Sequence, residues 1–347
     1  MSIVIGRPVV QTAPHWVTTP ELVEDMKRRF RPEDLDDKWL RMLRQTGIEK
    51  RPWLAPLEET ASLEGAGPRS RAAYSGALEM AVGAASEALE TAGLDPRRVD
   101  CIVTTHTASW TVPGMDVDLV DRLGLRPDVS RIGLATVACA GGGHALIQAV
   151  RFVRAEPGAR VLVVAAEPLS TLYSPLAGPP TMQSVLYAGL FGDAAAAAVV
   201  SEEPTGDGPG LRVENTWEFV LPHSADAYWG VYEETGIAFE SGPAAPTAAD
   251  RILPYVKEWL GERPVDWAAV HPGGPRIISG TLNGLGLDPE AAGHHARASL
   301  SHGNLGGVAL LDVLSRSLAA DAPPRGPGAA VAFGPGFTGS GLYLQAG

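Results

Sequence analysis

Short apolar runs alternate along this chain with longer segments in which apolar residues recur every three or four positions. The short runs are typical of strands buried on both faces, and the longer segments predict amphipathic helices. Strands are expected at 2–10, 99–105, 134–138, 159–165, 194–200, 211–219, 267–270, 328–333 and 341–345. Helices are expected at 20–30, with Thr19 as the N-cap, and at 32–47, 70–93, 114–123, 183–190, 246–260, 277–285 and 308–318. Residues 291–302 are expected to be helical or irregular. This alternation predicts an α/β fold with helices on both faces of the sheet.

A segment rich in turn-forming residues, SEEPTGDGPG at 201–210, separates two parts of the chain. Proline and glycine in such clusters mark connections rather than helices or strands. Helices and strands follow one another in a matching order on either side, although no repeat of residues is visible. We therefore expect a duplicated fold, with an N-terminal half over residues 1–205 and a C-terminal half over residues 206–347.

Composition narrows the class of protein further. The 347 residues are 45% hydrophobic, which is enough for a sizeable core, and the net charge of -12 argues against a general nucleic-acid-binding protein. Two cysteines, Cys101 and Cys139, exclude a disulfide scaffold and a cysteine-rich zinc site, and they fit a reducing compartment. No signal peptide and no apolar run of membrane-spanning length is visible, so we expect a cytoplasmic protein without a membrane anchor.

One cluster of positive charge stands out in this acidic chain. Lys38, Arg41 and Arg44 fall on roughly one face of the predicted helix, and Lys50 and Arg51 follow it. Such a face is either simply solvated or a docking site for a ligand that carries phosphate groups.

The stretch LATVACAGGGHALIQAV, residues 134–150, predicts a strand, a sharp turn at Cys139 and a helix whose pattern is visible from His144. The N-terminus of a helix favours an anion, so a thiol placed there is biased toward the thiolate. The glycines after Cys139 would allow a tight turn and the close approach of a ligand. A small buried cysteine in a helix contact is the alternative.

Two further corners resemble the one at Cys139. His271 ends a short apolar run and precedes Pro-Gly-Gly, and Asn304 precedes Leu-Gly-Gly. Ligands of α/β folds collect at the carboxyl ends of strands, so these corners are expected to meet. The three residue types together predict nucleophilic catalysis, in which His271 pairs as imidazolium with the Cys139 thiolate. N–H groups of His271, Asn304 or the Cys139 backbone would then stabilise an oxyanion.

Several motifs, including these three corners, have a recognisable form. They are Pro113-Gly114, Cys139-Ala-Gly-Gly, Leu190-Phe191-Gly192-Asp193, Gly236-Ile-Ala-Phe239, His271-Pro-Gly-Gly-Pro275, Gly303-Asn304 and Phe333-Gly-Pro-Gly336. Across nearly the whole chain, they resemble the type III polyketide synthases of the chalcone synthase superfamily. Within that superfamily, the sequence pattern most resembles that of bacterial members such as tetrahydroxynaphthalene synthase. The resemblance implies the thiolase-like duplicated αβαβα layered fold.

The resemblance also implies roles for individual residues. Cys139 would carry the acyl chain, and His271 and Asn304 would bind the malonyl thioester and stabilise its enolate. Phe191 and Phe239 would be gatekeepers between the coenzyme A tunnel and the cavity. The residues implied in coenzyme A binding are Lys38, Arg41, Arg44 and Arg276. The residues implied in shaping the cavity are Thr107, Val112, Leu172, Tyr187, Tyr228, Gly230 and Gly306.

The activity implied is the loading of an acyl-CoA starter and its extension with malonyl-CoA, followed by closure to a pyrone, a resorcinol or a related aromatic. Thr107 stands where the naphthalene-forming members carry a second cysteine, so other starters are at least as compatible. The expected partners are acyl-CoA, malonyl-CoA and a second copy of the chain, with no metal, no nucleic acid and no cofactor beyond the thioester substrates. The alternatives are a β-ketoacyl synthase III-like enzyme, an acyltransferase without decarboxylation, and a non-catalytic subunit of the same fold.

Overall fold

The computed structural model describes residues 2–204, 206 and 209–347. Its strands are β1 (Ile3–Gly6), β2 (Val9–Thr12), β3 (His15–Thr18), β4 (Lys50–Trp53), β5 (Cys101–His106), β6 (Ser130–Ala135), β7 (Val161–Glu167), β8 (Ala194–Ser201), β9 (Gly210–Val220), β10 (Tyr228–Glu233), β11 (Gly236–Ser241), β12 (Trp267–Val270), β13 (Gly326–Gly334) and β14 (Thr338–Ala346). Its α-helices are α1 (Thr19–Arg29), α2 (Asp37–Arg44), α3 (Leu57–Ala61), α4 (Ala66–Thr91), α5 (Met115–Arg122), α6 (Gly141–Ala155), α7 (Met182–Leu190), α8 (Ala245–Leu260), α9 (Pro275–Gly284), α10 (Pro289–Ala292), α11 (His294–Leu300) and α12 (Ala309–Ala319). Short 3-10 turns include η2 (Ala138–Ala140) and η4 (Gly306–Val308).

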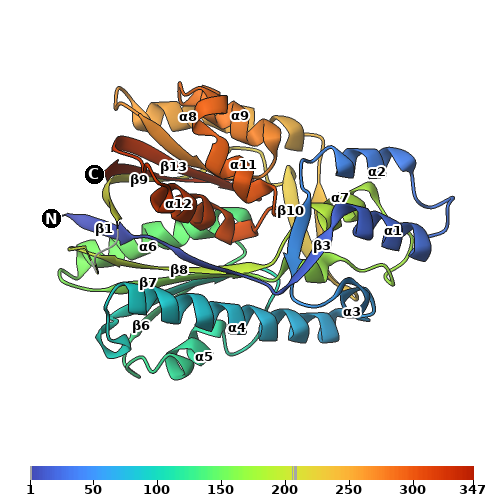
Figure 1. Cartoon of the computed structure of the whole chain (residues 1–347), viewed down its shortest axis with the longest axis horizontal. Helices are drawn as coiled ribbons and strands as arrows, with labels where there is room; N and C mark the ends of the chain where they lie inside the picture. The colour runs from blue at the N-terminus through green and yellow to red at the C-terminus, as the bar shows by residue number, and fades with distance from the viewer. Residues whose placement is uncertain (1, 205, 207–208) are drawn as a thin grey trace.

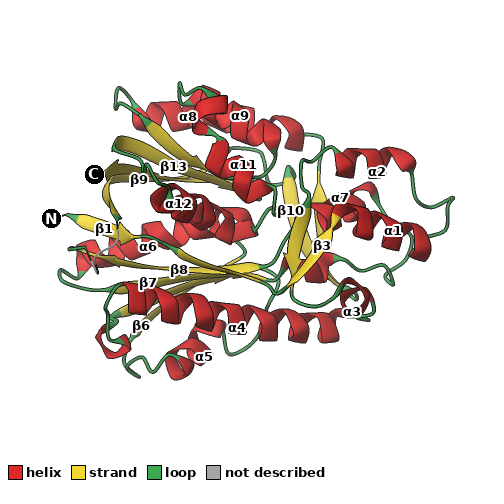
Figure 2. Cartoon of the chain, in the orientation of Figure 1, coloured by secondary structure: helices red, strands yellow, loops and turns green. Residues whose placement is uncertain are grey.

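Ten strands of the described residues form one continuous sheet in the order β12-β13-β14-β9-β1-β8-β7-β5-β6, with β2 paired to β8. The sheet bends around α6 and α12, so that five layers follow one another (Figure 1). Helices α8 and α9 cover the outer face of one half, and α4 and α5 cover that of the other (Figure 2). This is the predicted αβαβα arrangement.

The side-chain alternation of the strands explains why the sheet is covered on both faces. In β7, Val161, Val163 and Ala165 pack on the central helices, whereas Leu162, Val164 and Ala166 pack beneath α4 and α5. β13 alternates in the same way between the central core and the core under α8. Successive side chains of a strand point to opposite faces, so a fully apolar run fits only a strand with two covered faces.

The two halves share the sheet through the first strand of the chain. β1 pairs antiparallel with β8 on one side and with β9 on the other. The predicted boundary at residues 205 and 206 falls in the connection between β8 and β9, where residues 205, 207 and 208 lie outside the described residues.

Several local predictions differ from the structure. The strand predicted at 2–10 is two strands, because it is broken at Arg7 and Pro8. The first helix is capped by Thr18, whose side chain and Glu21 form a reciprocal capping box, and not by Thr19. The helix predicted at 32–47 begins only at Asp37, since the Asp36 carboxylate accepts the Lys38 N–H and caps it. Elements absent from the prediction are β3, β4, β10, β11 and α3.

Candidate active site

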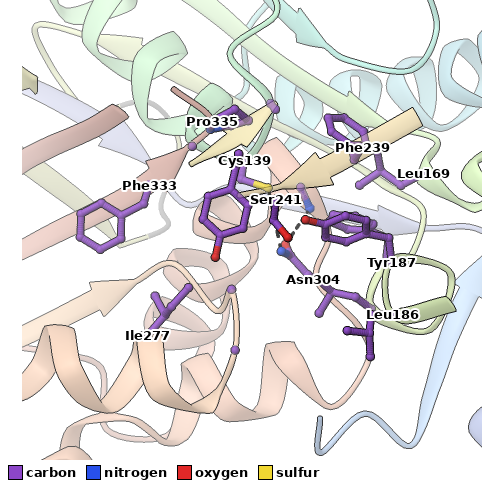
Figure 3. A pocket seen from close by; sticks show the side chains of 18 of the residues that line it. Cys139, Leu169, Leu186, Tyr187, Phe239, Ser241, Ile277, Asn304, Phe333 and Pro335 are labelled. Atoms are coloured by element: carbon purple, nitrogen blue, oxygen red, sulfur yellow. Dashed lines mark hydrogen bonds between the residues drawn. The ribbon is translucent and has the colours of Figure 1, made fainter. Parts of the chain in front are cut away.

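A cavity of about 390 Å³ opens where the two halves of the sheet meet, and the three predicted corners lie in its wall. Cys139 comes from η2 ahead of α6, His271 follows β12, and Asn304 precedes η4. Figure 3 shows the Cys139 sulfur facing Asn304 within this pocket. The fold thus brings together residues 132 and 165 positions apart from Cys139.

The turn that carries Cys139 is held in an unusual backbone conformation. Thr136 and Ala138 have φ values of 64° and 42°, in the left-handed region that residues with a side chain rarely adopt. Strain of this kind is found where a fold must direct a side chain to a functional position. Here the turn leaves Cys139 at the cavity wall, immediately ahead of α6.

The structure explains the three glycines after Cys139 differently from the prediction of a tight turn. They lie within the first turn of α6 and are buried. A Cβ on Gly141 would come within 2.7 Å of the Thr105 hydroxyl, and one on Gly142 would collide with the Gly307 carbonyl. The glycines therefore let β5 and η4 approach the start of the helix, instead of forming the turn itself.

Asn304 is fixed in one orientation by its hydrogen bonds. Its backbone N–H donates to the Leu190 carbonyl at 2.8 Å, and its carbonyl accepts from Gly192 N–H at 3.1 Å. The side-chain Oδ1 accepts from Gly306 N–H at 3.0 Å, so Nδ2 points toward the Cys139 sulfur, 3.9 Å away. The carboxamide therefore presents a donor to the space in front of the thiol.

His271 is buried at 3% exposure, and its Nδ1 has no hydrogen-bond partner among the described residues. Burial lowers the pKa of His271 to about 4. Burial, reinforced by Glu167, raises the pKa of Cys139 to about 12, although the hydrogen bond from Asn304 opposes this rise. Burial thus opposes the charged form of each residue taken alone, and the thiolate–imidazolium pair stays a prediction.

The two predicted gatekeepers meet a third aromatic ring. The rings of Phe191 and Phe239 lie 6.2 Å apart, and the ring of Tyr187 stacks on Phe191 at 5.7 Å and meets Phe239 edge-on at 6.4 Å. All three line the cavity. Tyr187 thus belongs to the aromatic cluster between α7 and β11, in addition to its expected place in the wall.

The other predicted cavity residues divide into two groups. Thr107, Tyr228 and Gly306 line the cavity. Leu172 lines instead a second cavity of about 290 Å³, on the far side of Tyr187 and Phe239. Gly230 lies opposite Phe239 in the β10–β11 hairpin and limits that ring rather than the cavity. Val112 does not line the cavity of its own chain, because its loop carries the side chain out to full exposure.

The helix that carries three of the predicted basic residues reaches the cavity, although none of the basic side chains lines it. Met42 of α2 lines the cavity, and Lys38 lies four positions before it on the same helix face. Lys38, Arg41 and Arg44 are exposed, and no ion pair of theirs is found among the described residues. Arg276, in contrast, is paired with Asp250 at 2.8 Å.

Glu167 is a cavity residue that the sequence did not reveal. It ends β7, is fully buried and lines the cavity, and it accepts hydrogen bonds from Thr107 and Gly307. The sequence feature that could have indicated Glu167 is an acidic residue at the end of a run of valine and alanine. Among the described residues, no three His, Cys, Asp or Glu side chains gather as a metal site would require, and no helix has the length and apolarity of a membrane span.

Comparisons with known proteins agree with this geometry. The family model described as chalcone and stilbene synthases, N-terminal domain, matches residues 20–204. The 1,3,6,8-tetrahydroxynaphthalene synthase of Streptomyces coelicolor is 31% identical over 341 residues, which cover 96% of this chain and 89% of that protein. Phloroglucinol synthase of Pseudomonas fluorescens is 26% identical and covers 95% of both chains.

Solved structures show the same relationship. Germicidin synthase from Streptomyces coelicolor, a type III polyketide synthase, superposes with a TM-score of 0.91 at 29% identity and covers both chains completely. The tetrahydroxynaphthalene synthase of the same organism gives a TM-score of 0.91, 29% identity and 99% coverage of each chain. The chain therefore belongs to the chalcone and stilbene synthase family and is a type III polyketide synthase, an acyltransferase that forms carbon–carbon bonds.

Proposed function

We propose that the chain loads an acyl-CoA starter onto Cys139, extends it by decarboxylative condensation with malonyl-CoA, and releases a pyrone, a resorcinol or a related aromatic. The observation that carries this proposal is the approach of Asn304 Nδ2 to the Cys139 sulfur at 3.9 Å, with His271 in the same buried wall. A nucleophile with two N–H donors in front of it is what acyl transfer followed by enolate formation requires.

In the loading step, the Cys139 sulfur attacks the carbonyl carbon of the acyl thioester. The bond from carbon to the coenzyme A sulfur breaks, and the Cys139 proton leaves with the coenzyme A thiol. The oxyanion formed in between needs donors, and the amide of Asn304 faces that space. The neutral imidazole favoured by the lowered pKa of His271 supplies its remaining N–H as a second donor.

In the extension step, the malonyl carboxylate leaves as carbon dioxide and its electron pair forms an enolate on the thioester. His271 and Asn304 donate to the enolate oxygen, and the enolate carbon attacks the acyl group on Cys139. A carbon–carbon bond forms, and the thiolate of Cys139 is released for the next cycle. The wall of the cavity is largely apolar, with Phe191, Phe239 and Phe333 in it, and it therefore keeps water away from the enolate.

The decisive experiment follows carbon dioxide. The enzyme is incubated with an acyl-CoA and with malonyl-CoA labelled in its free carboxyl group, and the released label and the acyl-enzyme are measured together. We expect release of carbon dioxide in step with chain extension. Acyl-enzyme without any release of label contradicts the proposal and leaves simple acyl transfer.

The starter is proposed to be an acyl-CoA other than malonyl-CoA. Thr107 lies in the cavity wall, and its hydroxyl is engaged with Glu167 at 3.0 Å, so this position offers no second thiol. The related proteins are named for tetrahydroxynaphthalene, phloroglucinol and germicidin, which shows that this fold serves several products. Mass spectrometry of the products from a panel of acyl-CoA starters tests this choice, and efficient priming by malonyl-CoA alone contradicts it.

Coenzyme A phosphates are proposed to bind the unpaired charges of Lys38, Arg41 and Arg44. These side chains lie on α2, whose Met42 lines the cavity, so the pantetheine arm could reach Cys139 from there. Because catalysis needs Cys139 as a free thiol, we place the enzyme in a reducing compartment such as the cytoplasm.

The chain is proposed to work as a homodimer. β6 is an edge strand that pairs only with β5 in the described sheet, and most of its residues are exposed. Trp110, Val112 and Tyr232 are exposed apolar side chains, and the rings of Trp110 and Tyr232 lie 5.8 Å apart. An open edge and exposed aromatic rings are typical of a surface that a second copy covers. Light scattering at micromolar concentration should give twice the mass of the chain, and a monomer contradicts the proposal.

A further inference from the structure

Arg69 is a buried arginine near the start of α4, and no ion pair of its side chain is found among the described residues. Its guanidinium donates to three backbone carbonyls instead, those of Thr171 and Tyr173 at 2.8 Å and that of Leu63 at 2.7 Å. Burial lowers the pKa of Arg69 to about 10, so the side chain is still charged at neutral pH. Burying a charge without an acidic partner is unfavourable, and an apolar side chain would fill this place without that cost. The three hydrogen bonds therefore need an explanation of their own.

Two of the three carbonyls belong to the cavity wall. Thr171 and Tyr173 lie on either side of Leu172, at the end of the 3-10 turn η3 (Leu169–Leu172). Leu172 packs in the apolar cluster that also contains Cys139. The guanidinium therefore fixes the backbone on both sides of a residue that packs near the nucleophile.

The start of α4 also holds the turn of the β10–β11 hairpin. A Cβ on Gly236 would lie 3.3 Å from Arg69 Cδ, so the stem of the arginine packs closely against this glycine. Gly236 has a φ of 117°, which favours glycine. In the same turn, the Glu234 carbonyl accepts the Ala66 N–H at 2.8 Å. The hairpin is thus attached to α4 at two points.

The two segments that Arg69 joins, η3 and β11, both line the second cavity of about 290 Å³. Leu172 comes from η3, and Ile237 and Phe239 come from β11. Leu172 and Ile237 share the apolar cluster with Cys139, and Phe239 lines both cavities. The spacing between η3 and β11 therefore decides how much room an acyl group on Cys139 finds beside the aromatic cluster.

We propose that Arg69 is a positioning residue that ties η3 to the β10–β11 hairpin and thereby limits the length of the acyl starter that Cys139 accepts. Arginine suits this task because its planar fork reaches three carbonyls at once, whereas a lysine ammonium is a single point of attachment. The effect on starters rests on the loading step of the proposed function. The tie between the two segments does not, because it belongs to the free enzyme.

The first test compares amide hydrogen exchange in the wild type and in Arg69→Lys, measured by mass spectrometry without substrate. Lysine keeps the charge but cannot hold all three carbonyls together. We expect peptides that cover residues 169–173 and 228–241 to exchange about tenfold faster in the variant, as the loss of local hydrogen bonds implies. Peptides from α6 and β12 should exchange as in the wild type. Unchanged exchange in the two segments, or faster exchange throughout the chain, overturns the tie.

The second test measures how fast Cys139 is acylated by butanoyl-CoA and by decanoyl-CoA, from intact-protein mass spectra. In Arg69→Lys a long chain can push η3 and the hairpin apart, whereas a short chain gains nothing from this freedom. We expect the ratio of the decanoyl rate to the butanoyl rate to rise about tenfold. An unchanged ratio, even with lower rates for both starters, means a merely structural role and overturns the effect on starters.

Arg51→Lys provides the matched control. Arg51 is also a fully buried arginine that donates to uncharged oxygens, those of the Val17 carbonyl and the Thr19 hydroxyl, and neither partner belongs to η3 or to the hairpin. Its replacement should leave unchanged both the starter ratio and the exchange of residues 169–173 and 228–241. A shift equal to that of Arg69→Lys would show that any change at a buried arginine has this effect, and it would overturn the assignment to Arg69.

Gly236→Ala reaches the same contact from the hairpin and keeps the proposal testable if Arg69→Lys does not fold. Its Cβ would press on Arg69 Cδ, and alanine disfavours the φ of 117°. We expect the starter ratio to rise as in Arg69→Lys, with malonyl-CoA decarboxylation little changed because Asn304 and His271 are untouched. A ratio equal to that of the wild type contradicts the effect on starters. If the wild type forms no acyl-enzyme, the proposed function fails, and the hydrogen-exchange results still decide the tie.

Discussion

The N-terminal half of the sheet delivers the nucleophile to the cavity, whereas the C-terminal half delivers the N–H donors. Cys139 stands on a turn with Ala138 in the left-handed region, a conformation that costs on the order of 1–3 kcal/mol. In front of Asn304 the unusual backbone angle falls on a glycine, Gly303, with a φ of 88°. The backbone strain is thus confined to the side of the cavity that carries the reacting sulfur.

The difference also appears in how each group is held. Asn304 is fixed by three hydrogen bonds to its backbone and side chain, which leaves its Nδ2 directed at the sulfur. Cys139 has the Asn304 amide as its side-chain hydrogen-bond partner, and the cavity wall around it is largely apolar. Donors that are fixed in advance can stabilise charge as it forms without reorganising, whereas the thiol must stay free to form and break its acyl bond.

The largest loss of activity is expected for a variant of the N-terminal half, which carries the nucleophile. Cys139→Ala should abolish the acyl-enzyme, because no other thiol faces the cavity and the second cysteine, Cys101, lies buried within β5. Intact-protein mass spectrometry after incubation with acyl-CoA measures the adduct. Cys101→Ala is the control and should load normally. An adduct that persists on the Cys139→Ala variant would move the nucleophile elsewhere.

The second-largest loss of activity is expected for a variant of the C-terminal half, which provides the N–H donors. Asn304→Ala removes the N–H that faces the sulfur, and the loss of one such donor lowers rates by about 10²–10³-fold in other enzymes. We expect this loss in malonyl-CoA decarboxylation, with a smaller loss in starter loading, since loading needs the nucleophile first. Parallel assays of labelled carbon dioxide and of acyl-enzyme measure the two steps. Equal losses in both would mean that the two halves do not divide the chemistry in this way.

The sequence was sufficient to predict the site where its chemistry coincides with a local pattern. The glycines after Cys139, His271 and Asn304 marked all three corners. The strand before the corner was predicted correctly only for His271, which follows β12 directly. The strand predicted at 134–138 ends at Ala135 in β6, and Asn304 follows helix α11 instead of a strand. Covered strands such as β7 and β13 were predicted for the same reason, because a run that is apolar on both faces admits few alternatives.

Features that depend on long-range packing were not accessible in this way. The strand β10 has five exposed residues and no apolar alternation, so nothing in its local pattern distinguished it from a loop. The hydrogen bond that Glu167 accepts from Gly307 joins residues 140 positions apart, and the exposure of Val112 depends on the direction of a loop. The pKa shifts of Cys139 and His271 follow from how deeply both side chains are buried, which only the assembled fold determines.

A smaller effect, on the KM for coenzyme A thioesters, is expected for the basic residues. The two halves differ here in whether these residues are paired. Lys38 and Arg41 are exposed and without an ion pair among the described residues, whereas Arg276 is held by Asp250. The double variant Lys38→Ala with Arg41→Ala should raise the KM for coenzyme A thioesters about tenfold at low salt, and less at high salt because salt screens exposed charges. Arg276→Ala should change this KM by about twofold at most. A larger effect of Arg276 would place the coenzyme A phosphates on the C-terminal half.

The smallest effect, on the preference between starters, is expected at the aromatic cluster, to which α7 contributes Tyr187 and β11 contributes Phe239. Gly230→Ala would place a Cβ 2.9 Å from Phe239 Cε1, so the ring, which lines the cavity, must shift. We expect a few-fold preference for short acyl-CoA starters over long ones, with decarboxylation little changed, because Asn304 is untouched. Gly280→Ala is the control, since its Cβ meets only Asp250 Oδ1 at 3.7 Å. Competition between two starters, read from the product masses, measures the preference. An unchanged ratio would show that Phe239 moves freely, so that the donor half does not limit chain size.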